Sequence, residues 1–265
     1  MKFFGINPIK LEGSKFGISL GYSKHVSLTL EGKNYFPILV AQIVNWNIKD
    51  LLQLEERNLS IKIMDKNNAL NFSILTKKTP HLARIPVCGC GIIKLGNSPW
   101  GPYTNFEIGK VKNWRSILVD VAWDFKASGV ADLVFDSWIT KNKTGLPKIT
   151  DMELMVWLDY KNLYPFGEKK EESEKFSVHY SPLKKVKKFL PIQKCGTVSY
   201  FYTKSSLKKI SFDLIKLILN SAKYFKIKNI KNYWIRTIDF GVEYARNTKV
   251  EAKIYKLKYK FSSAP

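Results

Sequence analysis

Short runs of apolar or alternating residues, separated by turn residues, dominate the sequence. An apolar residue at every second position is the period of a β-strand with one buried face. A stretch rich in Pro and Gly, residues 86–102, separates an early set of runs from a later set. The runs lie at residues 25–30, 35–46, 60–64, 71–76, 106–111, 116–125, 130–140, 150–160, 176–180, 196–203, 233–244 and 250–261. So many short strands predict an all-β sandwich or barrel.

One segment breaks this period. From Ser211 onward, apolar residues including Leu214, Leu217 and Ile218 recur at helical spacing. We therefore predict a single helix at about 211–224, capped by Ser211 and packed on the sandwich.

Two further local predictions concern the strands themselves. The alternation changes near residues 254–255, which indicates a bulge in the last strand. Residues 168–175 mix acids and lysines and have the composition of a surface loop. No internal repeat is visible. A sandwich of about 200–250 residues commonly forms one domain, so we expect residues 1–265 to form a single domain.

The charge of the chain first suggests a polyanionic partner. Lys and Arg number 44 against 22 Asp and Glu, a net charge of +22. However, only five of the cations are arginines, the side chain that favours bidentate contacts with phosphates and bases. The lysines are spread along the whole chain, with one dense run at residues 184–188. Nucleotide bias, ion-pair networks at high temperature and solubility also explain such an excess. We expect no nucleic-acid partner, and nucleic-acid binding stays a rival hypothesis.

Neither a membrane segment nor a metal site is evident in the sequence. No apolar run approaches the ~18 residues of a spanning helix, and the N-terminus lacks the apolar core of a secretory signal. Cys88, Cys90 and Cys195 are odd in number and lack the spacing of a zinc site. We expect no disulfide, no metal and no membrane partner.

Carboxylates stand at unusual positions in the predicted strands. The strand at 150–160 places Glu153, Met155 and Trp157 on the face opposite its apolar set, which is Met152, Leu154, Val156 and Leu158. A carboxylate between Met and Trp in mid-strand is costly unless it is paired or used. The alternative is an exposed strand face that carries a single acid.

Neighbouring strands show the same combination. In the preceding strand Asp136 lies on the face that also carries a tryptophan, and a hairpin between the two strands would let Asp136 and Glu153 face each other. A strand near the C-terminus carries Asp239 and Glu243 on one face, with Gly241 between them. Glycoside hydrolysis needs two carboxylates that flank the bond, together with aromatic platforms for the sugar rings.

These residues carry a resemblance to a known family. The sequence Glu-Leu-Met-Val-Trp-Leu at 153–158 resembles the nucleophile strand of glycoside hydrolase family 12, the jelly-roll β-glucanases. Phe-Gly-Val-Glu at 240–243 resembles the second signature of that family, and Asp136 matches the acid that hydrogen-bonds the nucleophile. The resemblance extends over residues 44–261.

The resemblance also implies substrate-binding positions. Trp46 resembles a tryptophan platform, and Trp100 follows Pro99 as in a Pro-Trp loop of the family. For each of these two tryptophans, a core position is an equally good interpretation. Trp138, Met155 and Trp157 complete the predicted substrate-binding set because they lie on the faces that carry the acids.

The resemblance thus implies a β-jelly roll of two antiparallel sheets with one α-helix, acting as a retaining endo-β-1,4-glucanase. Glu153 would be the nucleophile, Glu243 the acid/base and Asp136 the residue that positions Glu153. We expect a β-glucan polysaccharide as substrate, a monomer, and no organic cofactor. The family implies an extracellular location, although no signal is visible in this chain.

Some residues depart from the family pattern. Val44 stands where the family has Asn, Tyr244 and Ala245 replace a small residue or Pro and an aromatic, and residues 82–96 differ most. The main rival is a carbohydrate-binding protein of the same fold that does not cut its ligand. The presence of both glutamates favours the enzyme.

Overall fold

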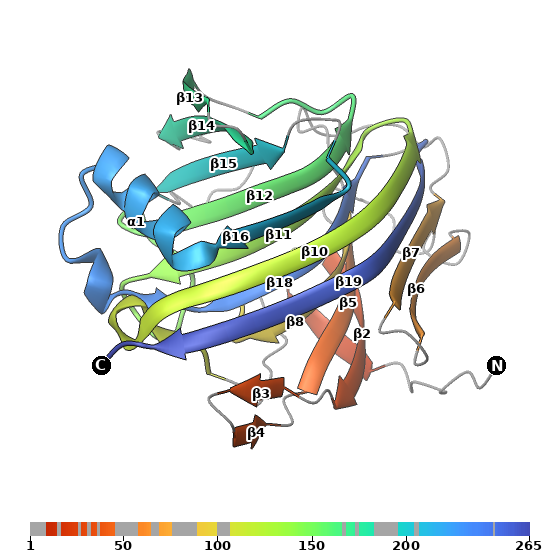
Figure 1. Ribbon diagram of the computed structural model, residues 1–265. Helices are drawn as coiled ribbons and strands as arrows, with labels where there is room; N and C mark the ends of the chain where they lie inside the picture. The colour runs from red at the N-terminus through yellow and green to blue at the C-terminus, as the bar shows by residue number, and fades with distance from the viewer. Residues whose placement is uncertain are drawn as a thin grey trace.

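Two β-sheets stack face to face and curve together in the computed structural model (Figure 1). The structure describes residues 9–14, 17–25, 28–30, 33–35, 38–45, 58–64, 69–75, 89–99, 107–165, 168–172, 175–182, 196–203, 207–245 and 247–265. Within these residues, a 12-stranded sheet, here the large sheet, lies against a 5-stranded sheet, the small sheet.

The large sheet runs, from edge to edge, through β1 (Ile9–Ser14), β2 (Gly17–His25), β5 (Ile38–Asn45), β8 (Gly89–Gly96), β18 (Thr237–Tyr244), β11 (Ala131–Thr140), β12 (Met152–Lys161), β15 (Thr197–Thr203), β14 (Phe176–Pro182) and β13 (Glu168–Glu172). Two short strands, β9 (Gly109–Lys110) and β17 (Trp234–Ile235), join it beside β11. The small sheet runs through β16 (Lys209–Asp213), β10 (Trp114–Ser128), β19 (Lys249–Ser263), β7 (Ala69–Leu75) and β6 (Asn58–Met64). A separate hairpin consists of β3 (Leu28–Leu30) and β4 (Lys33–Tyr35). The predicted all-β jelly roll with one helix is therefore confirmed.

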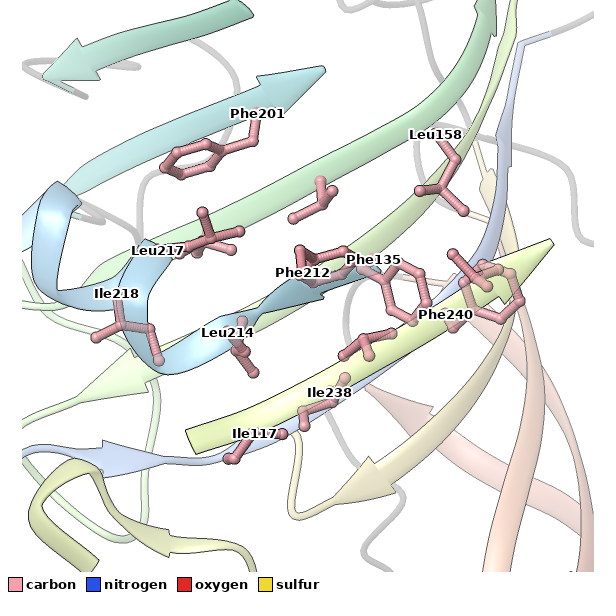
Figure 2. Close-up of a cluster of buried hydrophobic side chains, with 14 of the residues drawn as sticks. Ile117, Phe135, Leu158, Phe201, Phe212, Leu214, Leu217, Ile218, Ile238 and Phe240 are labelled. Atoms are coloured by element: carbon pink, nitrogen blue, oxygen red, sulfur yellow. The ribbon is translucent and has the colours of Figure 1, made fainter. Parts of the chain in front are cut away.

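The core lies between the two sheets, as the alternation predicts. The apolar set of β12, which is Met152, Leu154, Val156 and Leu158, is buried there. Phe135 of β11 stacks on Phe240 of β18 at 4.4 Å between ring centroids and meets Phe212 of the small sheet edge-on at 5.4 Å (Figure 2). Because this face of each central strand fills the core, the alternate residues must point to the opposite face.

The helix begins later than the sequence predicts. α1 spans Leu214–Tyr224, and residues 209–213 form the edge strand β16. Ser211 is therefore a strand residue, and Asp213 is the N-cap, whose carboxylate accepts from the backbone N–H of Ile215 at 3.0 Å. The error arises because β16 runs directly into the helix, so no turn residues mark the boundary. α1 packs on β10 and β12, as expected.

Four other segments can be compared with the sequence prediction. β8 lies inside the Pro- and Gly-rich stretch, and β13 occupies the segment predicted as a loop, because ladder pairing with β18 and β14 overrides local composition. The run at 106–111 yields only β9 and the start of a short 3-10 helix at Val111–Asn113. The predicted bulge is confirmed, since the pairing of β10 with β19 skips Tyr255. None of the described helices is long and apolar enough to cross a membrane.

Candidate active site

Five carboxylates gather on the face of the large sheet that points away from the core. They come from three neighbouring central strands, and we call them the carboxylate cluster: Asp132 and Asp136 on β11, Glu153 on β12, and Asp239 and Glu243 on β18. β11 lies between the other two strands, so the proposed nucleophile and acid/base approach from its two sides. Direct cross-strand pairing joins Asp136 to Asp239 and Asp132 to Glu243.

The predicted hairpin of β11 and β12 is confirmed, but its register differs from the one expected. Trp138 lies directly opposite Glu153, and Asp136 lies opposite Met155. Asp136 is therefore a diagonal neighbour of Glu153 on the same face and does not face it directly. Diagonal neighbours remain within reach of long side chains.

Burial and mutual repulsion govern the protonation of the two glutamates. Burial, followed by the charge of Glu243, raises the pKa of Glu153 to about 8. Burial raises the pKa of Glu243 to about 7. Near neutral pH such a pair holds one proton between its two carboxyls, which supplies one acid and one base. The higher pKa would by itself give the proton to Glu153, whereas the resemblance of the two motifs to the family predicts that Glu243 is the acid.

The aspartates of β11 are also held away from water. Burial, then the charges of Glu153, Asp239 and Glu243, raises the pKa of Asp136 well above its ordinary value. Its Oδ1 is buried without a hydrogen-bond partner. Asp132, which the sequence analysis did not select, is fully buried and accepts from the backbone N–H of Glu243 at 3.3 Å. Asp132 is an even number of positions from Asp136 in the same strand and therefore lies on the same face, and this spacing in the sequence could have identified it.

A buried lysine completes the described part of the site. Lys94 of β8 is 2% exposed, and its Nζ lies 3.6 Å from Asp239 Oδ2 and 3.0 Å from Ser98 Oγ. The hydroxyl of Thr237 donates to the Asp239 carboxylate. The sequence analysis missed Lys94 because it treated residues 86–102 as a break between strands.

One of the three cysteines considered in the sequence, Cys90, lies at the candidate site. Cys90 of β8 is paired in register with Glu243, is a free thiol, and has a pKa raised first by burial and then by the charge of Glu243. Cys88 and Cys195 lie outside the described residues. Across the described part of the chain, no group of side chains could hold a metal ion.

The predicted substrate-binding residues divide into two sets. Trp138, Met155 and Trp157 lie on the same face as the cluster but are 4%, 7% and 3% exposed. Trp46 and Trp100 lie outside the described residues, so their assignment stays a prediction.

An aromatic cluster adjoins the carboxylates on this face. Trp157 packs edge-on against Tyr200 of β15 and tilts against Tyr160, and its Nε1 is buried without a hydrogen-bond partner. Tyr200 is paired in register with Met155, the next residue after Glu153 on the same face of β12, and burial followed by the charge of Glu153 raises the pKa of its phenol. An indole N–H without a partner in the protein can donate to a sugar hydroxyl.

A separate cavity of about 410 Å³ lies beyond the C-terminal end of α1. Its lining includes Lys141, Asp151, Lys226 and Tyr233 and contains no member of the carboxylate cluster. The cavity is therefore separate from the candidate active site.

Comparisons with known proteins identify the family and the fold of the chain. A family model, "Glycosyl hydrolase family 12", matches residues 76–260, more than half of the chain. No curated protein sequence matches the chain significantly. Among solved structures, a family 12 xyloglucanase from Bacillus licheniformis is similar at 15% identity and TM-score 0.63, covering 91% of this chain and 99% of that one. An endoglucanase from Rhodothermus marinus is similar at 14% identity and TM-score 0.61, covering 92% and 99%. At these identities the structural similarity shows the fold.

Proposed function

The chain belongs to glycosyl hydrolase family 12, and on that premise we propose that it is a retaining endo-β-1,4-glucanase acting on internal bonds of cellulose-type β-glucans. The observation that carries the proposal is the pair Glu153 and Glu243, held on two strands that flank β11, with both pKa values raised towards neutrality. Retaining glycosidases use two carboxyls about 5–5.5 Å apart, one as nucleophile and one as acid/base.

In the first step, ionised Glu153 attacks the anomeric carbon and forms a covalent glycosyl-enzyme. The glycosidic bond breaks, and protonated Glu243 gives its proton to the leaving oxygen. Burial lets Glu243 hold a proton at mildly acidic pH, and its role as the acid requires that Glu153 be the ionised member of the pair. Asp136, a diagonal neighbour on the same face, positions Glu153.

In the second step, Glu243 is ionised and acts as a base. It takes a proton from a water molecule, whose oxygen attacks the anomeric carbon, and the Glu153 carboxylate leaves. Two inversions at one carbon retain the β-configuration. Neither step requires a metal or an organic cofactor.

The aromatic residues beside the acids support a polysaccharide as the substrate. Sugar rings stack on aromatic faces, and Tyr160, which is half-buried and paired in register with Asp132, lies beside Trp157 on this face. The similar structures include both an endoglucanase and a xyloglucanase. The proposed substrate is therefore a cellulose-type β-glucan, and the proposed enzyme is a monomer.

The test is reducing-sugar release from carboxymethyl cellulose, mixed-linkage β-glucan and xyloglucan. The wild type should release sugar from at least the first two substrates, and Glu153→Gln should release none. Glu107→Gln, which alters an exposed acid paired with Lys143, is the matched control and should keep wild-type activity. Binding of glucan by the wild type without release of sugar under any condition would support the non-catalytic carbohydrate-binding alternative.

A further inference from the structure

A row of charged residues crosses the candidate active site at right angles to the strands. Register places Lys94 of β8 opposite Asp239 of β18, Asp239 opposite Asp136 of β11, and Asp136 opposite Met155 of β12. Directly paired side chains on one face lie about 4.5–5.5 Å apart at Cβ. Two carboxyls therefore stand side by side, with a buried ammonium on one side and Glu153 diagonally on the other.

Asp239 is buried and Asp136 is half-buried with one carboxyl oxygen buried, so the two adjacent carboxyls cannot both be ionised cheaply and one of them keeps a proton. The surroundings of the two aspartates differ in a way that decides which one. Asp239 has Lys94 at 3.6 Å and accepts from the hydroxyl of Thr237, and both partners favour its ionised form. Asp136 has a buried Oδ1 without a partner and lies diagonal to Glu153 as well as directly opposite Asp239.

We propose that Lys94 and Asp239 are positioning residues that fix the proton of this row on Asp136, so that Asp136 donates a hydrogen bond to ionised Glu153. Lys94 holds the negative charge on Asp239, and that charge keeps Asp136 neutral. A neutral Asp136 can donate to the Glu153 carboxylate, whereas an ionised Asp136 would repel it. The inference rests on the proposed role of Glu153 as nucleophile.

The pKa shifts of the two aspartates agree with this asymmetry. Burial raises the pKa of Asp239, but Lys94 and Thr237 oppose the rise. Burial raises the pKa of Asp136 well above its ordinary value, three neighbouring acids add to the rise, and Lys94 opposes it only as the last of the causes.

Other titratable groups surround this row on the same face of the sheet. On the strands from β8 to β14 the described titratable groups of this face include Cys90 and Lys94 on β8, Asp239 and Glu243 on β18, Asp132 and Asp136 on β11, Glu153 and Tyr160 on β12, Tyr200 and Tyr202 on β15 and His179 on β14. The residues that β5 pairs with this face of β8, which are Val40, Gln42 and Val44, are not titratable. Lys94 is the only cation among the described side chains placed directly beside the acids.

The proposal is tested by removing the charge of Asp239 alone and then the charges of Asp239 and Lys94 together. Asp239→Asn leaves Lys94 uncompensated, so the pKa of Asp136 should fall by about one unit or more and the Asp136 proton should be lost at lower pH. Lys94→Met combined with Asp239→Asn removes both charges and should return the pKa of Asp136 towards the wild-type value. A second substitution that restores what the first one lost is not expected from a purely structural role.

The primary measurement is carboxyl ¹³C NMR of Asp136 against pH, with Asp136→Asn used for assignment. The second is the pH profile of kcat on soluble β-glucan, whose alkaline limb should shift to lower pH in Asp239→Asn and recover in the double variant. At a fixed pH on that limb, a shift of one unit corresponds to about a tenfold loss of rate. Lys249→Met, at an exposed ion pair with Glu251, should change neither measurement.

Two results would overturn the inference: an Asp136 titration that is the same in wild type and Asp239→Asn, or a double variant that titrates like Asp239→Asn. If Lys94→Met prevents folding, the Asp136 titration in Asp239→Asn decides alone. If the wild type hydrolyses no glucan, the proposed function fails, whereas the NMR titration still decides where the proton resides.

Discussion

At the scale of single residues, the candidate site is defined by carboxylates that a strand face would normally exclude. The free energy of burying an ionised carboxylate is high unless it is paired or protonated. Asp132 and Asp136 each keep a buried oxygen without a partner. The five acids of the carboxylate cluster lie together on one face of the large sheet, and the pKa of each is raised. Titratable groups with perturbed pKa values cluster at functional sites.

The different roles of the two glutamates can be separated with an activated substrate. Glu153→Ala should be inactive on both glucan and an aryl β-glycoside, because a nucleophile is needed whatever the leaving group. Glu243→Ala should lose activity on glucan by about 10²–10⁴-fold yet still form the intermediate from the aryl glycoside, which needs no acid. Azide should then accelerate turnover and yield a β-glycosyl azide, identified by NMR.

This experiment also distinguishes the two ways in which the proton can be assigned. If azide rescues Glu153→Ala and not Glu243→Ala, then Glu153 is the acid, as its higher pKa alone would suggest. Formation of an α-glycosyl azide in place of the β-anomer would contradict retention.

The raised pKa values also predict how stability depends on pH. A glutamate in an unfolded chain titrates near pH 4.3. In the folded protein Glu243 and Glu153 titrate at about 7 and about 8, so the folded state binds more protons between these limits. The free energy of unfolding should therefore fall as pH rises from about 4.5 to 8.

Urea unfolding at a series of pH values measures this slope. The variant Glu153→Gln with Glu243→Gln removes both titrations and should flatten the decline over that window relative to the wild type. An equal slope in the two proteins would mean that these carboxyls are not perturbed.

At the scale of elements, the junction of β16 and α1 is held by a single carboxylate. Asp213 accepts from the backbone N–H of Ile215 at 3.0 Å and from that of Ile117, on the neighbouring strand, at 3.1 Å. Asp213→Ala should therefore lower the free energy of unfolding by about 1–2 kcal/mol, measured by urea denaturation.

A matched substitution separates the cap from the charge. Asp213→Asn keeps an oxygen acceptor and should lose less than Asp213→Ala. If both variants lose the same amount, the carboxylate does not act through these two hydrogen bonds.

A glycine permits the close contact of β8 and β18 beside the carboxylates. A Cβ on Gly241 would lie 2.1 Å from the carbonyl oxygen of Gly91. The two strands could not keep their present separation with any other residue at this position. In the sequence Gly241 lies between Asp239 and Glu243, and this close contact of the two strands is the physical reason for a glycine there.

At the scale of the whole molecule, aromatic residues join the two sheets. Phe135 stacks on Phe240 of the large sheet and meets Phe212 of the small sheet (Figure 2). Phe135→Ala should lower the free energy of unfolding by about 3–5 kcal/mol, because it leaves a cavity between the sheets. Thermal and urea unfolding measure the loss.

Phe135→Leu fills more of the same space and should lose clearly less. Equal losses for the two substitutions would show that the position does not act through packing volume.

The sequence alone determined the fold class and the face on which the acids lie. Side chains of a strand alternate between its two faces. Leu133 and Phe135 point into the core, so Asp136 lies on the opposite face, whichever strand pairs with β11. The motif at 153–158 likewise identified the family before any tertiary contact was known.

Only the tertiary structure decided which residues meet. Register, which depends on pairing between distant segments, put Asp136 beside Asp239 and made it a diagonal neighbour of Glu153. The same pairing made a central strand of residues 89–96, despite their glycines, and brought Lys94 to within 3.6 Å of Asp239. Local composition carries no information about such partners, because β18, which brings Asp239 beside both Lys94 and Asp136, lies more than a hundred positions from either residue along the chain.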